Sequence, residues 1–104
     1  MNWKDPNIER LIEAILSLEA PDEAKRFLRD LMTENEIEEF SKRLAAALML
    51  SEKVSYSDIE KKTGFSSTTV ARVSKWLNDG EGGYKTIINK IHHHNPSKLR
   101  RGLS

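Results

Sequence analysis

The stretch that decides the fold is SYSDIEKKTGFSSTTVARVSKWLN, residues 55–78. It predicts two short helices joined at Gly64, because glycine tolerates the left-handed backbone that closes a helix. Ser55 and Ser66 each carry a hydroxyl that can cap the helix that follows. Residues 54–78 therefore form a predicted helix-turn-helix. Its predicted core side chains, spaced on one face of each helix, are Ile59, Val70, Val73 and Leu77.

The opposite face of the second helix carries small and polar side chains, which suit contact with DNA. Hydroxyl and methyl groups let a helix sit deep in a major groove, where they reach base edges and thymine methyl groups. Free amides at the helix N-terminus and nearby basic side chains favour phosphates. A solvated face on a structural helical hairpin has the same composition, so the pattern alone leaves both interpretations open. The candidate DNA-binding residues are Ser66, Ser67, Thr68, Ala71, Arg72 and Lys75.

Outward from this segment, apolar periodicity predicts four more helices and no strand, hence an all-α fold in one domain, 1–104. Proline begins each of the first two helices, and a capping box, Thr33 to Glu36, begins the longest. Of these four helices, two are expected to start at Pro6 and Pro21, the third to run from Glu34 to about Leu50, and the fourth to span 84–91. We expect residues 1–52 to form the dimerisation and core helices and residues 92–104 to form a mobile tail.

Composition narrows the possible functions. The chain has no cysteine, which excludes a disulfide framework and a thiolate zinc site. No apolar run reaches the length of a membrane span, so we expect a cytoplasmic protein with no membrane partner. No glycine-rich phosphate loop or Ser/His/Asp arrangement indicates an enzyme. Consecutive helical residues point about 100° apart, so His92–His94 cannot converge on one ion, and we expect neither metal nor cofactor.

Charge is divided unevenly along the chain. Residues 1–40 carry five basic and eleven acidic side chains, a net −6, whereas residues 41–104 carry twelve and five, a net +7. A polyanion is therefore expected to meet the second half. The first two helices are short and each presents an apolar stripe, which predicts a homodimer in which a second subunit covers them. The alternative is that all stripes close within one monomer.

Several motifs occur in a fixed order along the chain. The longest helix opens with Leu31-x-Thr33-x-x-Glu36, Thr69-Val70-Ala71-Arg72 lies in the second helix of the central segment, and Gly80-x-Gly82-Gly83-Tyr84 follows it. In this order they resemble the Trp repressor family, in its YerC/YecD-type branch. The resemblance implies a six-helix Trp-repressor-like fold and an intertwined homodimer. It also implies a transcriptional repressor whose recognition helices enter successive major grooves of a double-stranded DNA operator, about 34–36 Å apart.

The resemblance also implies a place for an effector. In the tryptophan-responsive repressor, arginines hold the ligand carboxylate and flank its indole, and the matching residues here are Arg43 and Arg72. Two small positions beneath that indole correspond here to Val73 and Trp76, so the indole of Trp76 can fill the slot itself. We therefore expect no requirement for L-tryptophan. The residues of this candidate effector pocket are Thr33, Arg43, Thr69, Arg72, Val73 and Trp76.

The first helix of the central segment departs from the family. Positions that are basic in the relative correspond here to Ser57 and Glu60, which displaces the expected phosphate contact toward Lys53, Lys61 and Lys62. Two other functions remain open from the sequence. One is a protein-interaction module that uses the acidic N-terminal helices. The other is a domain that senses a small carboxylate between Arg43 and Arg72.

Overall fold

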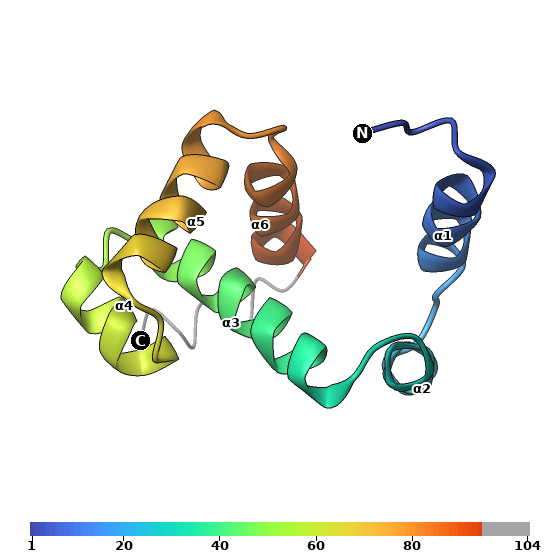
Figure 1. The fold of residues 1–104 in the computed structure, drawn as a ribbon, viewed down its shortest axis with the longest axis horizontal. Coiled ribbons are helices and arrows are strands. Elements are labelled where there is room, and N and C mark those ends of the chain that lie inside the picture. Colours follow the sequence, from blue (N-terminus) through green and yellow to red (C-terminus); the bar gives the residue numbers. More distant parts are fainter. Residues whose placement is uncertain (95–104) are drawn as a thin grey trace. The chain divides into compact units, whose positions relative to one another are not determined.

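A computed structural model describes residues 1–94, and this part of the chain contains six helices and no strand (Figure 1). The all-α prediction is confirmed. The helices are α1 (Pro6–Leu16), α2 (Pro21–Leu31), α3 (Glu34–Ser51), α4 (Tyr56–Thr63), α5 (Ser67–Asp79) and α6 (Gly83–His94).

The predicted starts of α1 and α3 are fixed by side-chain oxygens that accept backbone amides, whereas α2 begins at Pro21 without a side-chain cap. The Asp5 carboxylate accepts the amide of Asn7 at 2.8 Å, which caps α1. At the start of α3 the Thr33 hydroxyl accepts the amide of Glu36 at 3.1 Å, and the Glu36 carboxylate accepts the amide of Thr33 at 2.9 Å. This reciprocal capping box satisfies two amides that would otherwise lack partners, and it fixes where the longest helix begins.

The last helix is longer than the sequence analysis predicted. We expected it to end at Ile91 and the tail to begin at His92, but α6 continues through His94. Extending an existing helix by one residue adds a hydrogen bond without a new nucleation cost, so the loss of apolar periodicity does not by itself end it. The remainder of the predicted tail, 95–104, lies outside the described residues.

The chain forms two compact units, Met1–Glu38 and the part that begins at Glu39. The first unit contains α1 and α2, and neither helix has a buried residue. Its apolar stripe is left open at Leu11, Ile12 and Ile15, which are 39%, 42% and 46% exposed. The stripe that the sequence predicted is therefore present and uncovered.

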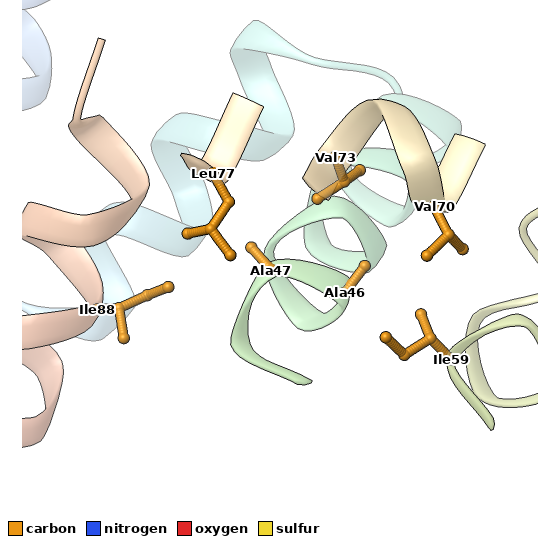
Figure 2. Packing of buried hydrophobic residues seen from close by; sticks show 7 residues of the cluster. All are labelled: Ala46, Ala47, Ile59, Val70, Val73, Leu77 and Ile88. Carbon is orange, nitrogen blue, oxygen red and sulfur yellow. The ribbon is translucent and has the colours of Figure 1, made fainter. Parts of the chain in front are cut away.

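The second unit holds the hydrophobic core, where α5 packs against α4 and α6. Figure 2 shows Leu77 of α5 between Ala47 of α3 and Ile88 of α6, with Ile59 of α4 near Val70. The core is thus built around the inner face of α5, as the spacing of its apolar residues predicted. Its members are Ala46, Ala47, Ile59, Val70, Val73, Leu77 and Ile88.

The face that α3 buries is not the one that its large apolar residues mark. Ile37, Phe40, Leu44 and Leu48 repeat at helical spacing, yet Phe40 is 42% exposed and the two fully buried residues of α3 are Ala46 and Ala47. Small side chains let two helix backbones approach closely, and they bury little area each. For that reason they contribute a weak periodic signal to the sequence while occupying the centre of the packing.

Candidate nucleic-acid interface

The turn between α4 and α5 is held by Gly64 and Thr63. Gly64 has φ of +78°, a left-handed conformation, and its amide donates to the carbonyl of Glu60 at 2.8 Å. The Thr63 side chain is buried, and its hydroxyl donates to the carbonyl of Ile59 at 2.7 Å while accepting the amide of Phe65 at 3.1 Å. One side chain therefore ties the last turn of α4 to the segment that leads into α5.

Ser66 begins α5. Its hydroxyl accepts the amide of Thr69 at 3.2 Å and lies 3.1 Å from the Thr69 hydroxyl. A capping hydroxyl of this kind is worth about 0.5–2 kcal/mol of stability. The structure thus gives Ser66, a candidate DNA-binding residue, a structural task at the first turn. At the other end Gly80 closes α5, and a Cβ added there would collide with the carbonyl oxygen of Trp76.

The outer face of α5 is open to solvent, whereas its inner face lies in the core. Val70 and Val73 are 0% exposed and Leu77 is 7% exposed. Because consecutive helical residues differ by about 100° in direction, anchoring these three aims the other side of the helix outward. The residues on that outer face are all exposed: Ser67, Thr68, Ala71, Arg72 and Lys75. We call these five residues the outer face of α5.

A shallow hollow of about 610 Å³ follows part of the outer face and is lined by Thr68, Ala71, Arg72, Lys75, Trp76 and Asp79. Two cationic side chains and one carboxylate border it, so it is basic except at the C-terminal end of the helix. Lys61 and Lys62, in the last turn of α4, are also exposed. Arg72 and Lys75 therefore border a small hydroxyl-bearing and methyl-bearing surface, which is a chemistry suited to a polyanion with base edges to read.

On the flank of α5, Arg43 of α3 contacts two aromatic rings. Its guanidinium carbon is 5.3 Å from the centre of the Phe40 ring and 5.6 Å from that of Trp76. Its Nε lies 3.4 Å from a carboxylate oxygen of Glu39. Cation–π contacts of this length are attractive by about 0.5–2 kcal/mol. The stack therefore ties α3 to α5 and gives the guanidinium partners on several sides.

The structure brings together some, not all, of the candidate effector-pocket residues. Arg43 and Trp76 are in contact, whereas Val73 is fully buried in the core. Thr69 is half-buried with its hydroxyl at the Ser66 cap, and Arg72 is exposed on the outer face. Thr33 belongs to the first compact unit, where its hydroxyl serves the capping box.

The structural roles that three residues play here were not predicted from the sequence. Phe40 and Glu39 precede Arg43 by three and four positions on one helix, so i,i+3 and i,i+4 spacing could have identified both as its partners. The hydrogen bonds of Thr63 were harder to predict from the sequence. A threonine immediately before a helix-closing glycine can hydrogen-bond back to the carbonyl four residues earlier, but many solvent-exposed threonines occupy the same position.

Within residues 1–94, no helix is long and apolar enough to cross a membrane. In the same part of the chain, no three histidine, aspartate or glutamate side chains gather in a way that could hold a metal ion.

Comparison with known proteins identifies relatives of this chain. The sequence pattern of the family described as Trp repressor protein matches residues 6–92. The protein YerC of Bacillus subtilis (strain 168), described as uncharacterised, is 39% identical over 84 residues, which are 81% of each chain.

Two solved structures share the fold. A TrpR-like protein from Eubacterium eligens ATCC 27750 is 43% identical with a TM-score of 0.82, covering 86% of this chain and 92% of that one. A candidate Trp repressor from Staphylococcus aureus is 34% identical with a TM-score of 0.81, covering 88% and 94%. The family is one of DNA-binding transcription regulators rather than of enzymes. With a matching pattern over most of its length and relatives above 30% identity, this chain belongs to the Trp repressor family.

Proposed function

We propose that this protein is a sequence-specific, DNA-binding transcriptional repressor in which α4 and α5 form a helix-turn-helix and α5 enters the major groove. The observation that carries the proposal is the division of α5 into a core-anchored inner face and an exposed outer face of small, hydroxyl-bearing and basic residues. Thr68 and Ala71 are short enough to let the helix backbone approach base edges. Repression would follow from occlusion, because a protein docked on an operator blocks polymerase access.

The roles of the outer-face residues follow from their chemistry. Ser67 and Thr68 offer hydroxyls to base edges, and Ala71 offers a methyl group to thymine. Arg72 and Lys75 carry the charge that pairs with phosphates on either side of the groove. Ser66 supports the interface by fixing the start of α5 rather than by reading bases.

Selection of preferred duplexes from a random pool, followed by gel shifts at two salt concentrations, tests this function. A regulator retains its preference as salt rises, because base contacts release no counterions. We expect the selected duplex to be bound about 10³-fold or more tightly than a scrambled one at the higher salt, in line with specific DNA binders in general. Equal loss of affinity for both duplexes would mean purely electrostatic binding, and no binding to either would favour a protein-interaction module.

We further propose that the protein acts in the cytoplasm as a homodimer. Each chain forms one domain, and the second copy covers apolar surface that the chain leaves exposed. Members of the family form dimers. In this chain each unit leaves apolar surface uncovered. Ile12 and Ile15 of α1 are exposed, and the second unit has an apolar groove of about 670 Å³ between α3 and α6, bordered by Trp76 and Ile87. A second copy is the occupant that covers both kinds of surface, and sedimentation equilibrium should report twice the 11.9 kDa chain mass.

We also propose that the protein binds DNA without a small-molecule effector. Arg43 already contacts two rings and a carboxylate of its own chain, so a free indole or a free carboxylate would compete with these contacts. In this proposal the indole of Trp76 takes the part of an aromatic ligand beside the arginine. The recognition helix is then held in place by the chain's own side chains.

Isothermal calorimetry with L-tryptophan checks this point. We expect no saturable heat and no change in DNA affinity when L-tryptophan is added. The Arg43→Ala variant serves as the matched control, because it removes the stack and should weaken DNA binding without creating a tryptophan response. Micromolar binding of L-tryptophan by the unmodified protein, or DNA binding that requires it, would contradict effector independence.

A further inference from the structure

A pocket of about 290 Å³ lies on the flank of α5 away from Trp76, between the end of α3, the turn that follows it and the start of α6. The residues that line it are Leu50, Ser51, Lys53, Ser74, Leu77, Asn78 and Lys85. We call it the lysine pocket. All of its residues belong to the second compact unit.

The lysine pocket is cationic. Lys53 and Lys85 reach it from two different elements, and no acidic residue lines it. Glu52 precedes Lys53 in the sequence but does not line the pocket, and the two acidic residues that follow Asn78, Asp79 and Glu81, border other hollows. Neither lysine forms an ion pair within the part of the chain that the structure describes. Two like charges that share one small hollow without a counterion favour the binding of an anion.

The hydrogen bonds inside the pocket leave a donor free beside the two ammonium groups. The Asn78 amide donates to the carbonyl of Ser74 at 2.9 Å and lies 3.4 Å from the Ser74 hydroxyl. That hydroxyl accepts from the amide, so its own hydrogen can point elsewhere. By contrast, the Ser51 hydroxyl already donates to the carbonyl of Leu48 at 2.6 Å. Two lysines and one available hydroxyl are a donor set that matches a phosphate group.

Lys53 is held in position by an unusual backbone. It is the only residue other than glycine with a positive φ, 66°, in the described chain. The turn is closed by its amide, which donates to the carbonyl of Leu50 at 3.1 Å, and by the amide of Val54, which donates to that of Met49 at 3.0 Å. A left-handed conformation costs a lysine about 1–2 kcal/mol, a cost that glycine does not incur. A function for the side chain at this position would account for the presence of lysine there.

The position of the pocket relative to the outer face indicates the source of the phosphate. Ser74 follows Ala71 by three residues and Ser67 by seven, so the three lie along one side of α5. A duplex seated on the outer face would pass its backbone along that side. We propose that the lysine pocket binds a phosphate group, and that the phosphate it takes is a backbone phosphate of DNA docked on α5. This inference rests on the proposed DNA-binding function and adds α6 and the α3–α4 turn to the interface.

The test compares two double variants of the full chain that carry the same net charge. Lys53→Gln/Lys85→Gln empties the pocket of charge, whereas Lys25→Gln/Lys90→Gln neutralises two exposed lysines outside it. For the pocket variant we expect about 10- to 100-fold weaker DNA binding and a plot of log affinity against log salt that is shallower by about one unit. Its preferred sequence should not change, because phosphates carry no sequence information. The control variant should bind DNA like the unmodified protein.

A second arm separates the two sources of phosphate. Amide shifts of labelled protein are followed during titration with inorganic phosphate, with chloride at matched ionic strength as the reference. Saturable shifts at Lys53, Ser74 and Lys85 that vanish in the pocket variant support the site. If these shifts occur but the pocket variant keeps the affinity and salt slope of the control, the DNA assignment is overturned and the site takes free anions only. If neither assay distinguishes the variants, the whole inference fails, while selective binding by the unmodified protein would leave the proposed function standing.

Discussion

Replacing Ala71 with glutamate is expected to lower the affinity for the preferred duplex by about 100-fold or more while leaving the melting temperature nearly unchanged. Ala71 lies at the centre of the outer face, between Thr68 and Lys75, and is exposed. A carboxylate there would face the phosphates of a bound duplex, and like charges brought together at an interface cost several kcal/mol. Glutamate is a good helix former, so α5 itself should tolerate the change. Fluorescence anisotropy with a labelled duplex measures the affinity.

The matched control for this variant is Asn35→Glu, which adds the same charge at an exposed position in the first turn of α3. It should change DNA binding by no more than the small effect of one unit of net charge. If Ala71→Glu bound DNA as well as this control, the outer face of α5 would not be the DNA-binding surface. Circular dichroism of both variants shows that any loss of binding occurs in folded protein.

Shortening Ile59 to alanine is expected to reduce the free energy of unfolding by about 2–5 kcal/mol. Ile59 is 0% exposed and is the only buried hydrophobic side chain that α4 contributes to the core. Removing it leaves a cavity between α4 and α5 that the neighbouring Val70 and Ala46 are too short to fill. Typical domains have only about 5–15 kcal/mol of stability, so this is a large share of the total. Urea denaturation at a fixed protein concentration measures the change, since association would otherwise shift the midpoint.

Two further variants serve as a smaller core truncation and a surface control. Ile59→Val removes one methylene and should cost about 0.5–1.5 kcal/mol. Lys61→Ala changes an exposed residue on the same helix and should stay within about 0.5 kcal/mol of the unmodified protein. A loss below about 1 kcal/mol for Ile59→Ala, similar to that of Lys61→Ala, would mean that α4 is not packed on α5 as described.

Local signals made the helix starts and the end of α4 predictable. Ser55, Ser66 and the Thr33–Glu36 pair each carry an oxygen that can accept a free amide, and each caps a helix in the structure. Gly64 ends α4 because the required left-handed backbone favours glycine. Such signals depend on residues close in the sequence, so they can be recognised without knowledge of tertiary contacts. The same holds for the inner face of α5, where Val70, Val73 and Leu77 repeat at helical spacing.

Tertiary contacts were harder to predict from the sequence. Nothing in the sequence of α3 indicated that Ala46 and Ala47 would be buried while Phe40 stayed 42% exposed, because burial depends on which helix packs where. The contact of Arg43 with Trp76 joins positions 33 residues apart, and only the resemblance to a known family suggested that they belong together. The lysine pocket likewise unites Lys53 and Lys85, which lie on separate elements and share no local pattern.

The most direct measurement is the change in backbone amide shifts when labelled protein is titrated with its selected duplex. The outer face of α5 should respond most strongly, with the largest changes at Ser67, Thr68, Ala71 and Lys75, because those residues would contact base edges and the flanking phosphates. Large changes confined to α1 and α2, with α5 unaffected, would contradict the account and locate the binding surface in the acidic first unit.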